Sequence, residues 1–437
     1  MTAVILAGGR GTRIASLHTG IPKPMIPLEG IPVLERQLCC LRRQGIRNVV
    51  LVVGHLHEVI EKYFGSGKKL AMRLSYVVEE EPLGTAGALY YLQEQLQEDF
   101  LLINGDLLFE IDLSRFQETH IKTIEKGGLV TILTHPNSHP YDSALIEVDE
   151  GAKVTAWRHR EDERRWYHNR VNAGIHMLSP GIFSWLRGMG HLDKVRPLDL
   201  DRGVLRPMIP YDLIYSYDSP EYVKDIGTPE RCQEVEEDLR QGRIRSLLQP
   251  QRAVFLDRDG TINEEKGFLH SEEQFRLLPG AASAIALLNR MGWLVIVVTN
   301  QPVIARGEIT LEELDNIHCK METLLGEEGA YVNAVYFCPH HPDSGFPGER
   351  PEYKTGCSCR KPKPGMLLEA AKQFHINLAL SWMVGDSERD MRAGETAGCH
   401  TAGLYGCTGE KSFCDLLEFA QFLHEEEGMR HEARTVS

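Results

Sequence analysis

Short apolar runs alternate with amphipathic stretches along this chain, and the alternation occurs in two separate series. The strand-like runs of the first half are residues 4–6, 49–53, 74–78 and 100–103, with an amphipathic stretch at 33–44. The second half has strand-like runs at 253–256, 294–298 and 335–337 and helical stretches at 281–290 and 311–325. This order is typical of α/β folds in which helices cover a parallel sheet. The sequence therefore predicts two α/β domains of three layers each.

The length of the chain also favours two domains. At 437 residues it exceeds the size at which one hydrophobic core stops growing. A charged helical segment follows Gly227, and the short stretch Gln249–Arg252 separates it from the next apolar run. We expect a first domain at residues 1–240, a linker at 241–251, a second domain at 252–425 and a disordered tail at 426–437.

Composition and charge limit the classes of partner. The net charge of −14 argues against a nucleic acid, because binding a phosphate backbone needs a basic surface. No apolar run is long enough to span a membrane, and MTAVILAGG is typical of a buried strand, not of a signal peptide. The ten cysteines do not form the disulfide framework of a secreted protein. We expect a cytoplasmic protein without nucleic-acid or membrane partners, and the oligomeric state is left open.

A glycine-rich loop, LAGGRGTR, directly follows the first strand. Gly8, Gly9 and Gly11 would let backbone N–H groups approach the phosphates of a nucleotide closely. The spacing does not fit a dinucleotide fingerprint, whose third glycine would fall on Ile14, or a P-loop, which needs Gly-Lys-Ser/Thr. On this feature alone, a tight strand-to-helix turn without a ligand explains the glycines equally well.

Two cations and two aspartates strengthen the nucleotide interpretation. Arg13 and Lys23 follow the loop closely, and together they could neutralise a leaving pyrophosphate. Asp106 ends a strand in NGD and Asp225 lies in KDIGTPE, so these carboxylates could hold one Mg²⁺ ion. Taken singly, each aspartate is more often a turn former or a helix cap. The small-residue loop at 82–88 would admit a base and its ribose.

The motifs LAGGRGTR, PKPM, EPLGTAGAL, NGD, VNAG and KDIGTPE, in this order, resemble the sugar-1-phosphate nucleotidyltransferases over nearly all of residues 1–240. Heptose-1-phosphate guanylyltransferases and muramic-acid-type uridylyltransferases are the most similar members. The resemblance implies a Rossmann-like nucleotidyltransferase fold and in-line attack by a sugar phosphate on the α-phosphorus of a nucleotide. It also implies triphosphate binding by Gly8, Gly9, Gly11, Arg13 and Lys23, base contacts by Glu79 and Gly84, sugar contacts by Asn172, and Mg²⁺ at Asp106 and Asp225.

One segment departs from this family. The Glu-Lys pair that many relatives have before the Asn-Ala-Gly strand is replaced by Trp157-Arg158-His159-Arg160. The charged run that follows, residues 160–170, is equally consistent with a solvated loop and with a lid over a sugar phosphate.

In the second half, FLDRDGT places two carboxylates two residues apart immediately after an apolar strand. Asp257 could attack phosphorus, while Asp259 could protonate the leaving oxygen and later activate water. A calcium loop is excluded because its sixth position needs glycine and is Ile262 here. Thr299 and Asn300 end the next strand and offer a hydroxyl and an amide to a phosphoryl group.

Further along, a lysine and an aspartate complete this pattern. Lys361 could balance the charge on phosphoryl oxygens, and Asp386 follows another strand as a magnesium ligand. Cys338, His340, Cys357 and Cys359 form Cys-x-His and Cys-x-Cys pairs, which predict a closed, structural zinc site. His341 is an alternative histidine ligand.

The motifs FLDRDGTIN, VVTNQ, CPHHP, CSCRKPKPGM and VGDSERDM resemble the heptose-1,7-bisphosphate phosphatases of the haloacid-dehalogenase superfamily over residues 251 to about 410, with histidinol phosphatases as near relatives. The resemblance implies a haloacid-dehalogenase fold with a zinc loop. It implies Mg²⁺ at Asp257, Asp259 and Asp386, phosphate contacts by Thr299, Asn300, Arg360 and Lys361, a substrate contact by Arg306, and Zn²⁺ at Cys338, His340, Cys357 and Cys359. Pro302-Val303 replaces the usual Ser-Gly, which predicts a changed pocket.

The two resemblances describe consecutive reactions, because the phosphatase would release the sugar 1-phosphate that the transferase consumes. We expect conversion of D-glycero-D-manno-heptose 1,7-bisphosphate to the 1-phosphate and then to a nucleotide-activated heptose, with GTP as the nucleotide and Mg²⁺ in both domains. The same chemistries on other substrates, such as mannose 1-phosphate and histidinol phosphate, are an alternative. A second alternative is a phosphatase regulated by a non-catalytic sugar-nucleotide sensor.

Overall fold

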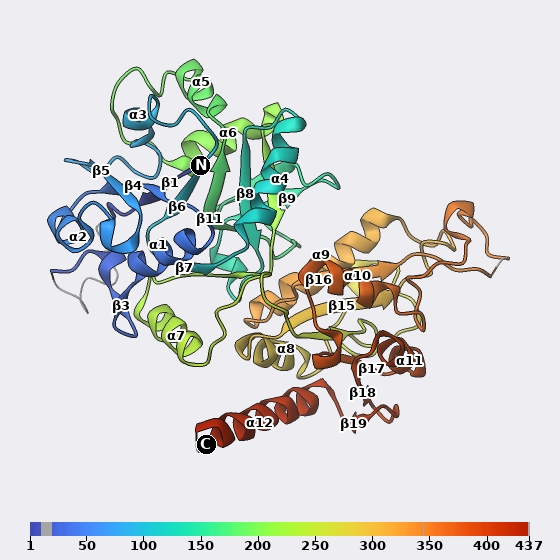
Figure 1. Ribbon diagram of the computed structural model, residues 1–437. Coiled ribbons are helices and arrows are strands. Elements are labelled where there is room, and N and C mark those ends of the chain that lie inside the picture. The colour runs from blue at the N-terminus through green and yellow to red at the C-terminus, as the bar shows by residue number, and fades with distance from the viewer. Residues whose placement is uncertain (10–19, 344, 436–437) are drawn as a thin grey trace. The chain divides into compact units, whose positions relative to one another are not determined.

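The computed structural model describes residues 1–9, 20–343 and 345–435, which form two compact units (Figure 1). The first unit comprises residues 1–134, 146–157 and 172–248, and the second comprises 135–145, 158–171 and 249–437. The second unit therefore includes two segments that precede residue 172 in the sequence. The domain limits expected at residues 240 and 252 do not anticipate these segments, and those limits stay a prediction.

A mixed sheet is the centre of the first unit. Within the described residues it has nine strands, in the order β10-β9-β11-β6-β1-β4-β5, with β8 paired to β11 and β12. The strands are β1 (Thr2–Leu6), β4 (Asn48–Val53), β5 (Arg73–Val78), β6 (Phe100–Asn104), β8 (Val130–His135), β9 (Leu145–Val148), β10 (Val154–Arg158), β11 (Val171–Leu178) and β12 (Ile214–Asp218). The β5-β4-β1-β6 half is parallel, as the alternation predicts, whereas β11 runs antiparallel to β6.

Two small sheets flank this one. They are β2 (Pro27–Leu28) with β3 (Ile31–Pro32), and β7 (Leu107–Glu110) with β13 (Tyr222–Asp225). The antiparallel β7–β13 pair sets Asp225 opposite Leu107, and the amide of Ile226 donates to the carbonyl of Asp106 over 3.0 Å. Two segments that are more than a hundred residues apart in sequence thus bring Asp106 and Asp225 to one place.

Helices cover the sheet of the first unit. They are α1 (Val33–Arg43), α2 (His57–Phe64), α3 (Leu89–Leu92), α4 (Leu113–Glu125), α5 (Gly181–Gly188), α6 (Arg206–Met208) and α7 (Pro229–Arg240). In α1, Leu34, Leu38 and Leu41 recur at helical spacing and are fully buried, which is the apolar stripe that packs a helix on a sheet. Asp112 caps α4 by accepting a hydrogen bond from the amide of Ser114.

The second unit contains a fully parallel sheet. Among the described residues its order is β16-β15-β14-β17-β18-β19. The strands are β14 (Ala253–Leu256), β15 (Leu294–Asn300), β16 (Ala334–Cys338), β17 (Trp382–Gly385), β18 (His400–Leu404) and β19 (Lys411–Phe413), and the helices are α8 (Ala281–Arg290), α9 (Leu311–Glu327), α10 (Gly365–Phe374), α11 (Glu388–Ala397) and α12 (Leu416–Thr435). In this half the predicted strands and helices agree closely with the structure.

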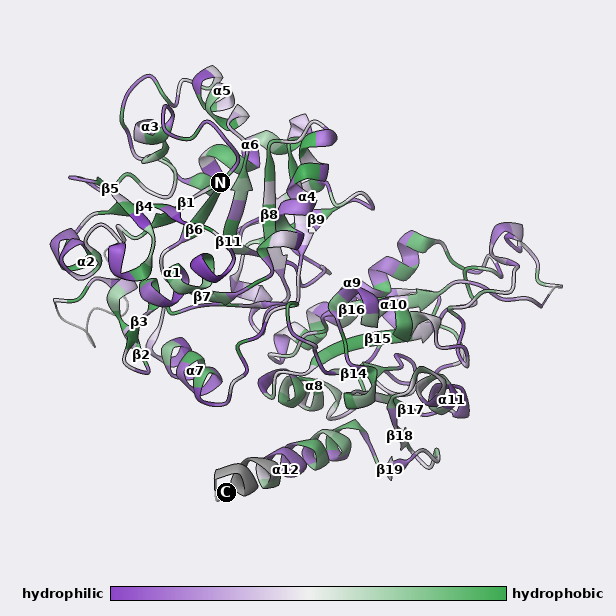
Figure 2. Cartoon of the chain, in the orientation of Figure 1, coloured by the Kyte–Doolittle hydropathy of each residue, from purple (hydrophilic) through white to green (hydrophobic). Residues whose placement is uncertain are grey.

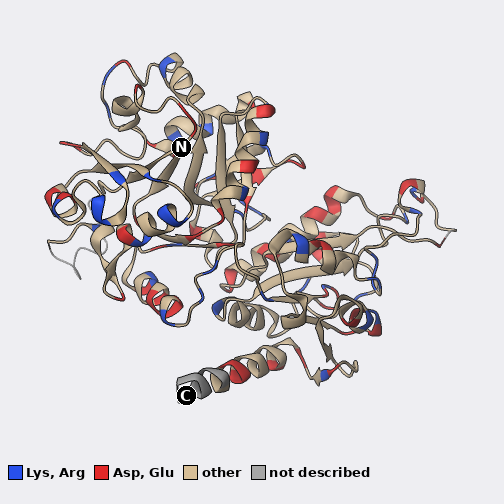
Figure 3. Ribbon diagram, viewed as in Figure 1, with Lys and Arg blue, Asp and Glu red and all other residues tan. Residues whose placement is uncertain are grey.

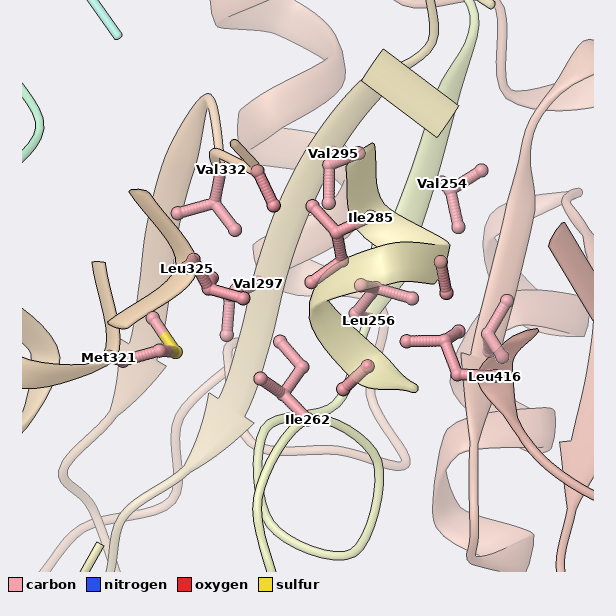
Figure 4. Packing of buried hydrophobic residues seen from close by; sticks show 14 of the residues in the cluster. Val254, Leu256, Ile262, Ile285, Val295, Val297, Met321, Leu325, Val332 and Leu416 are labelled. Carbon is pink, nitrogen blue, oxygen red and sulfur yellow. The ribbon is translucent and has the colours of Figure 1, made fainter. Parts of the chain in front are cut away.

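The hydrophobic core of the second unit explains why its apolar runs form strands and its amphipathic stretches form helices. In the second unit, Val254 and Leu256 of β14 pack with Ile285 of α8 and Val295 and Val297 of β15 (Figure 4). Figure 2 shows the central strands as mostly hydrophobic, while the helices are hydrophobic on one face and hydrophilic on the other. A strand buried on both faces needs such a continuous apolar run, which is why the runs are visible in the sequence.

The charged end of the chain differs from its prediction. Disorder is expected from residue 426, but α12 continues to Thr435, so this stretch is helical through residue 435. Glutamate, methionine, alanine and arginine favour helix strongly, and they outweigh the lack of an apolar period.

Charged side chains lie mainly on helices and loops (Figure 3). Across the described part of the chain, helices with the length and apolarity to cross a membrane are absent.

Candidate active sites

The first candidate site lies where the parallel strands of the second unit end. Asp257 follows β14, Thr299 and Asn300 end β15, and Asp386 follows β17. The carboxyl ends of neighbouring parallel strands meet at one edge of the sheet, which is where ligands bind in such folds. The predicted residues of this half are therefore brought together by the strand order β15-β14-β17.

Lys361 connects the carboxylates of this site. Its Nζ atom lies 2.9 Å from Oδ1 of Asp257 and 2.6 Å from Oδ1 of Asp390, and its side chain is only 2% exposed. Asn300 fixes the lysine backbone, because its Nδ2 donates to the Lys361 carbonyl and its Oδ1 accepts from the Lys361 amide, both over 3.0 Å. This arrangement places a buried positive charge between two carboxylates at the strand ends, and such a charge can balance that of a phosphoryl group.

Burial changes the protonation of these carboxylates. It raises the pKa of Asp257 to about 7, although the Lys361 ammonium opposes the shift. Burial and the nearby Asp390 charge also raise the pKa of Asp386. Carboxylates whose pKa is raised in this way gain most from a divalent cation, which stabilises their ionised form.

Asp257, Asp386 and Asp390 could hold such a cation. Each offers one oxygen, and the three oxygens lie within 4.8 Å of one another. Gly260, with a φ of +74°, lets the backbone approach closely, because a Cβ atom there would lie 2.0 Å from Oδ2 of Asp386. An all-oxygen donor set of this kind fits Mg²⁺. Asp390 is not among the predicted ligands. It lies in the first turn of α11, five residues after the end of β17, and this closeness to a strand end is the sequence feature that indicates it.

The side chain of Asp259 is held apart from this group. Its carboxylate accepts hydrogen bonds from Arg258, from Nδ2 of Asn263 over 3.0 Å and from Nε2 of Gln301 over 2.9 Å. Burial would raise the pKa of Asp259, but the charge of Arg258 and these hydrogen bonds outweigh it and lower the pKa. The predicted magnesium set of Asp257, Asp259 and Asp386 thus differs from the carboxylate group that the structure assembles.

The residues predicted to contact phosphate and substrate lie in the same unit, and each has partners of its own. Thr299 is buried, and its Oγ1 accepts from Nε2 of Gln301. Arg360 is half-buried and donates from Nη1 to the carbonyl of His340 over 3.2 Å. Arg306 is stacked between two aromatic rings, with Cζ 4.4 Å from the centroids of both Phe268 and Phe346. Arg306 therefore links the loop of Phe268 to the loop of Phe346.

The changed dipeptide Pro302-Val303 has a different effect from the one expected. Val303 is fully buried in the hydrophobic core of the unit, so its side chain adds to the core and not to a ligand pocket. Pro302 accepts a hydrogen bond from the amide of Arg306. The dipeptide is accommodated within the loop that carries Arg306.

Three cysteines and a histidine form a separate cluster in the second unit. Sγ of Cys338 lies 3.5 Å from Sγ of Cys357, 3.1 Å from Sγ of Cys359 and 3.7 Å from Nδ1 of His340. Four donors at these separations can surround one metal ion, and the Cys₃His set fits Zn²⁺. His341 lies outside the cluster, since its Nδ1 accepts from the amide of Asp343. Arg360 and Lys361 directly follow Cys359, so this cluster fixes their positions.

The second candidate site lies in the first unit, where β1 and β6 end. A Cβ atom on Gly8 would lie 2.9 Å from Oε2 of Glu79, so the loop can approach this carboxylate only without a side chain. Burial raises the pKa of Glu79, opposed by a hydrogen bond from the amide of Leu83. Among the described residues, none apart from its chain neighbours has an atom within 4 Å of a Cβ built on Gly9. Gly11 and Arg13 lie outside the described residues.

Lys23, Asp106 and Asp225 meet beside this loop. Lys23 Nζ lies 2.5 Å from Oδ2 of Asp106. Asp225 accepts two hydrogen bonds from Nη1 of Arg231, at 2.9 and 2.7 Å, and one from the amide of Gly227. Burial would raise the pKa of Asp225, but Arg231 outweighs it and lowers the pKa. The two aspartates are thus close together and each is already neutralised by a cation; Arg231 was not predicted.

The remaining predicted residues of the first unit lie in two further places. Gly84 has a φ of +75°, and a Cβ atom there would lie 2.6 Å from the carbonyl oxygen of Leu198. Asn172 on β11 donates weakly to Asp201 at 3.4 Å and accepts from the amide of Gly174. Burial and the Asp199 charge raise the pKa of Asp201 to about 6. Asp201 is not among the predicted residues, because the two aspartates of LDLD match no motif.

Comparison with known families gives a match for each half of the chain. Residues 2–242 match the nucleotidyl transferase family, and residues 209–398 match the haloacid dehalogenase-like hydrolases. A D-glycero-beta-D-manno-heptose-1,7-bisphosphate 7-phosphatase of Vibrio cholerae is 44% identical over 149 residues, which are 34% of this chain and 78% of that protein. The enzyme of the same name from Escherichia coli K12 is 42% identical over 152 residues, 35% of this chain and 78% of its own length.

A solved structure of HddC from Yersinia pseudotuberculosis complexed with GMP-PN is 25% identical, with a TM-score of 0.45, and covers 55% of this chain and 99% of that one. The matches to the two families lie in the two halves of the chain and overlap only at residues 209–242. The chain therefore belongs to the nucleotidyl transferase family through its first half and to the haloacid dehalogenase-like phosphatases through its second, and it is a fusion of two enzymes.

Proposed function

We propose that this chain catalyses two consecutive steps of nucleotide-sugar synthesis. Its second unit would hydrolyse the 7-phosphate of D-glycero-D-manno-heptose 1,7-bisphosphate, and its first unit would transfer GMP from GTP to the resulting heptose 1-phosphate with release of pyrophosphate. The observation that supports this most is the group of Asp257, Lys361 and Asp386 at the strand ends of the second unit. This group lies in the half of the chain that contains 149 residues 44% identical to a 7-phosphatase named for this bisphosphate. GTP as the nucleotide rests on the motif resemblance.

The proposed phosphatase reaction uses two aspartates in two steps. The Asp257 carboxylate attacks phosphorus and forms an aspartyl phosphate, while the sugar oxygen leaves with a proton from Asp259. Asp259 then accepts a proton from the water that attacks the aspartyl phosphate and releases inorganic phosphate. The lowered pKa of Asp259 favours the ionised form that this second step needs and opposes the protonated form that the first step needs. Lys361 balances the negative charge that builds up on the phosphoryl oxygens.

The proposed transfer is a single in-line displacement. The sugar phosphate attacks the α-phosphorus of the nucleotide, and pyrophosphate leaves. Lys23 and, as the motif resemblance implies, Arg13 would neutralise the charge of the pyrophosphate. Glycines 8, 9 and 11 would present backbone N–H groups to the triphosphate, while Glu79, Gly84 and Asn172 would contact base and sugar.

Metal ions have defined places in this proposal. Asp257, Asp386 and Asp390 would hold Mg²⁺ in the phosphatase, and Asp106 and Asp225 would hold it in the transferase, where Lys23 and Arg231 now neutralise them. Mg²⁺ supplies positive charge that orients and polarises the reacting phosphate. Zn²⁺ would be structural, at the four-residue cluster of Cys338, His340, Cys357 and Cys359. We place the enzyme in the cytoplasm, where it meets nucleoside triphosphates.

The test follows three products from one incubation. Purified full-length protein with Mg²⁺ and heptose 1,7-bisphosphate should release inorganic phosphate, and addition of GTP should also give pyrophosphate and GDP-heptose. Phosphate without nucleotide sugar, whichever nucleoside triphosphate is supplied, would contradict the transferase half of the proposal and favour a sensor. If neither phosphate nor nucleotide sugar forms, the proposed heptose substrate is contradicted. Mannose 1-phosphate and histidinol phosphate would then be tested as substrates.

Two variants separate the active sites. Asp257→Asn should abolish phosphate release but leave the enzyme able to use added heptose 1-phosphate and GTP. Asp106→Asn should abolish nucleotide-sugar formation and leave phosphate release unchanged. A loss of both activities in either variant would contradict the assignment of each residue to its own reaction.

A further inference from the structure

A second cluster of metal-ligand side chains joins α9 to the segment 158–171 and shares no residue with the candidate active sites. His168, Asp315 and Cys319 each offer one donor atom, and the three donors lie within 4.8 Å of one another. Nε2 of His168 is 3.0 Å from Oδ1 of Asp315, and Sγ of Cys319 is 3.9 Å from Oδ2 of Asp315. Asp315 and Cys319 are one helical turn apart, so they face the same side of α9.

The spacing of these donors resembles that of the cysteine cluster in the same unit. The donor-to-donor distances around Cys338 range from 3.1 to 3.7 Å, and those around Asp315 are 3.0 and 3.9 Å. An imidazole nitrogen, a carboxylate oxygen and a thiolate sulfur are all ligands of Zn²⁺. Two ligands at positions i and i+4 of a helix with a third from another segment is a common zinc arrangement.

A buried carboxylate orients the histidine as metal sites require. Oε1 of Glu322 lies 2.7 Å from Nδ1 of His168, and Oε2 of Glu322 accepts from the amide of Asn169 over 2.8 Å. Glu322 is 10% exposed. A ligating histidine almost always donates its other ring N–H to a carboxylate or carbonyl, which fixes the ring and increases its basicity. Glu322 therefore aims Nε2 of His168 at Asp315.

The cluster also joins two segments of the second unit. His168 lies in the segment 158–171, here called the strap, and the remaining ligands lie on α9. Beside the cluster, the amide of Tyr167 donates to Oγ1 of Thr323 over 3.0 Å, and Lys320 lies over the ring of Trp166 at 5.1 Å. The strap is thus packed on α9 and is not the solvated loop that its charge pattern allows.

We propose that His168, Asp315 and Cys319 form a second zinc site that pins the strap to α9, with Glu322 as the group that orients His168. A water molecule would complete the tetrahedron on the exposed side of Asp315. Without metal, the same residues form an ion pair in which a protonated His168 lies between the carboxylates of Asp315 and Glu322. Zinc binding would release that proton from His168 and the proton from the Cys319 thiol.

The experiment measures the metal content of the full-length protein. Metal-free protein is reconstituted with excess Zn²⁺, desalted and analysed by inductively coupled plasma mass spectrometry. We expect about two zinc ions per chain for the wild type and about one for Cys319→Ala. Cys399→Ala is the matched control, because Cys399 is also buried and lies outside both clusters; it should retain about two.

A second set of variants guards against a change in folding. Asp315 is 60% exposed, so Asp315→Asn should leave the fold intact and weaken binding at this site. Glu322→Gln keeps a hydrogen-bond acceptor and should lower the zinc affinity about 10–100-fold, as removal of such orienting groups does. Co²⁺ substitution provides an independent readout, since the thiolate-to-cobalt absorption should decrease in Cys319→Ala and not in Cys399→Ala.

The proposal is overturned if wild-type protein binds about one zinc ion, or if Cys319→Ala and Asp315→Asn bind as much as the wild type with the same affinity. In that case the residues would be an ion-pair network alone, and His168→Gln would change stability without changing metal content.

Discussion

Replacement of Lys361 by methionine tests the centre of the phosphatase site. The lysine is 2% exposed and lies between Asp257 at 2.9 Å and Asp390 at 2.6 Å. Lys361→Met keeps the length of the side chain but leaves two buried carboxylates without their cation. Removing one partner of a buried ion pair costs about 3–5 kcal/mol, because the remaining charge is left uncompensated.

This cost should appear in the stability of the second unit. For a unit of this size, each kcal/mol lowers the melting temperature by about 2–4 °C, so we expect a decrease of roughly 6–20 °C for that transition. Loss of a positive charge at the phosphoryl group should also reduce phosphate release by about 10²–10³-fold. Differential scanning calorimetry and a phosphate-release assay at saturating Mg²⁺ measure the two effects. Transfer from GTP to added heptose 1-phosphate should not change.

Two further variants serve as a control and as a test of the charge argument. Lys372→Met removes an exposed lysine from the nearby helix α10 and should change neither stability nor phosphate release. Lys361→Met combined with Asp390→Asn should recover part of the stability lost in the single variant, because one uncompensated carboxylate is neutralised. An unchanged melting temperature and unchanged phosphate release in Lys361→Met would refute the reasoning. A double variant less stable than the single one would refute the charge argument specifically.

Three further predictions concern a titration, a backbone conformation and a metal. Burial lowers the pKa of His176 from 6.5 to about 4, so the unfolded chain binds a proton at this histidine more readily than the folded chain does. The first unit should therefore lose about 3 kcal/mol of stability as the pH falls from 6.5 to 4. His176→Gln should weaken this pH dependence in thermal unfolding. Gly84→Ala should destabilise the first unit by about 1–3 kcal/mol and raise the KM for GTP, because its Cβ would lie 2.6 Å from the Leu198 carbonyl. Gly30→Ala should cost less, because Gly30 has a similar φ and, apart from its chain neighbours, no atom of the described residues lies within 4 Å of the added Cβ. Cys357→Ser should remove a zinc ion, as measured by mass spectrometry, and reduce phosphate release about tenfold or more without affecting transfer.

The sequence predicts most of the second unit because its strands are buried on both faces. Such strands appear as continuous apolar runs, and the polar residues that follow them must meet at one edge of a parallel sheet. The order of strands and polar residues is therefore enough to group Asp257, Thr299 and Asp386. The close spacing of the cysteine cluster in the chain likewise restricts its ligands to a small region. The antiparallel direction of β11 is not predicted, because pairing direction leaves no trace in a short apolar run.

The chain alone therefore determines the two α/β units, their order and the kind of chemistry at each strand end, since these depend on local periodicity and on motifs. Tertiary structure decides which charges neutralise one another. The pairing of Lys361 with Asp390, of Asp225 with Arg231 and of Asp259 with Arg258 follows from side-chain packing. Packing likewise decides that the strap residue His168 meets Glu322, more than 150 residues away in the chain. Contacts between distant segments depend on how whole elements fill space, and a linear pattern carries no record of that.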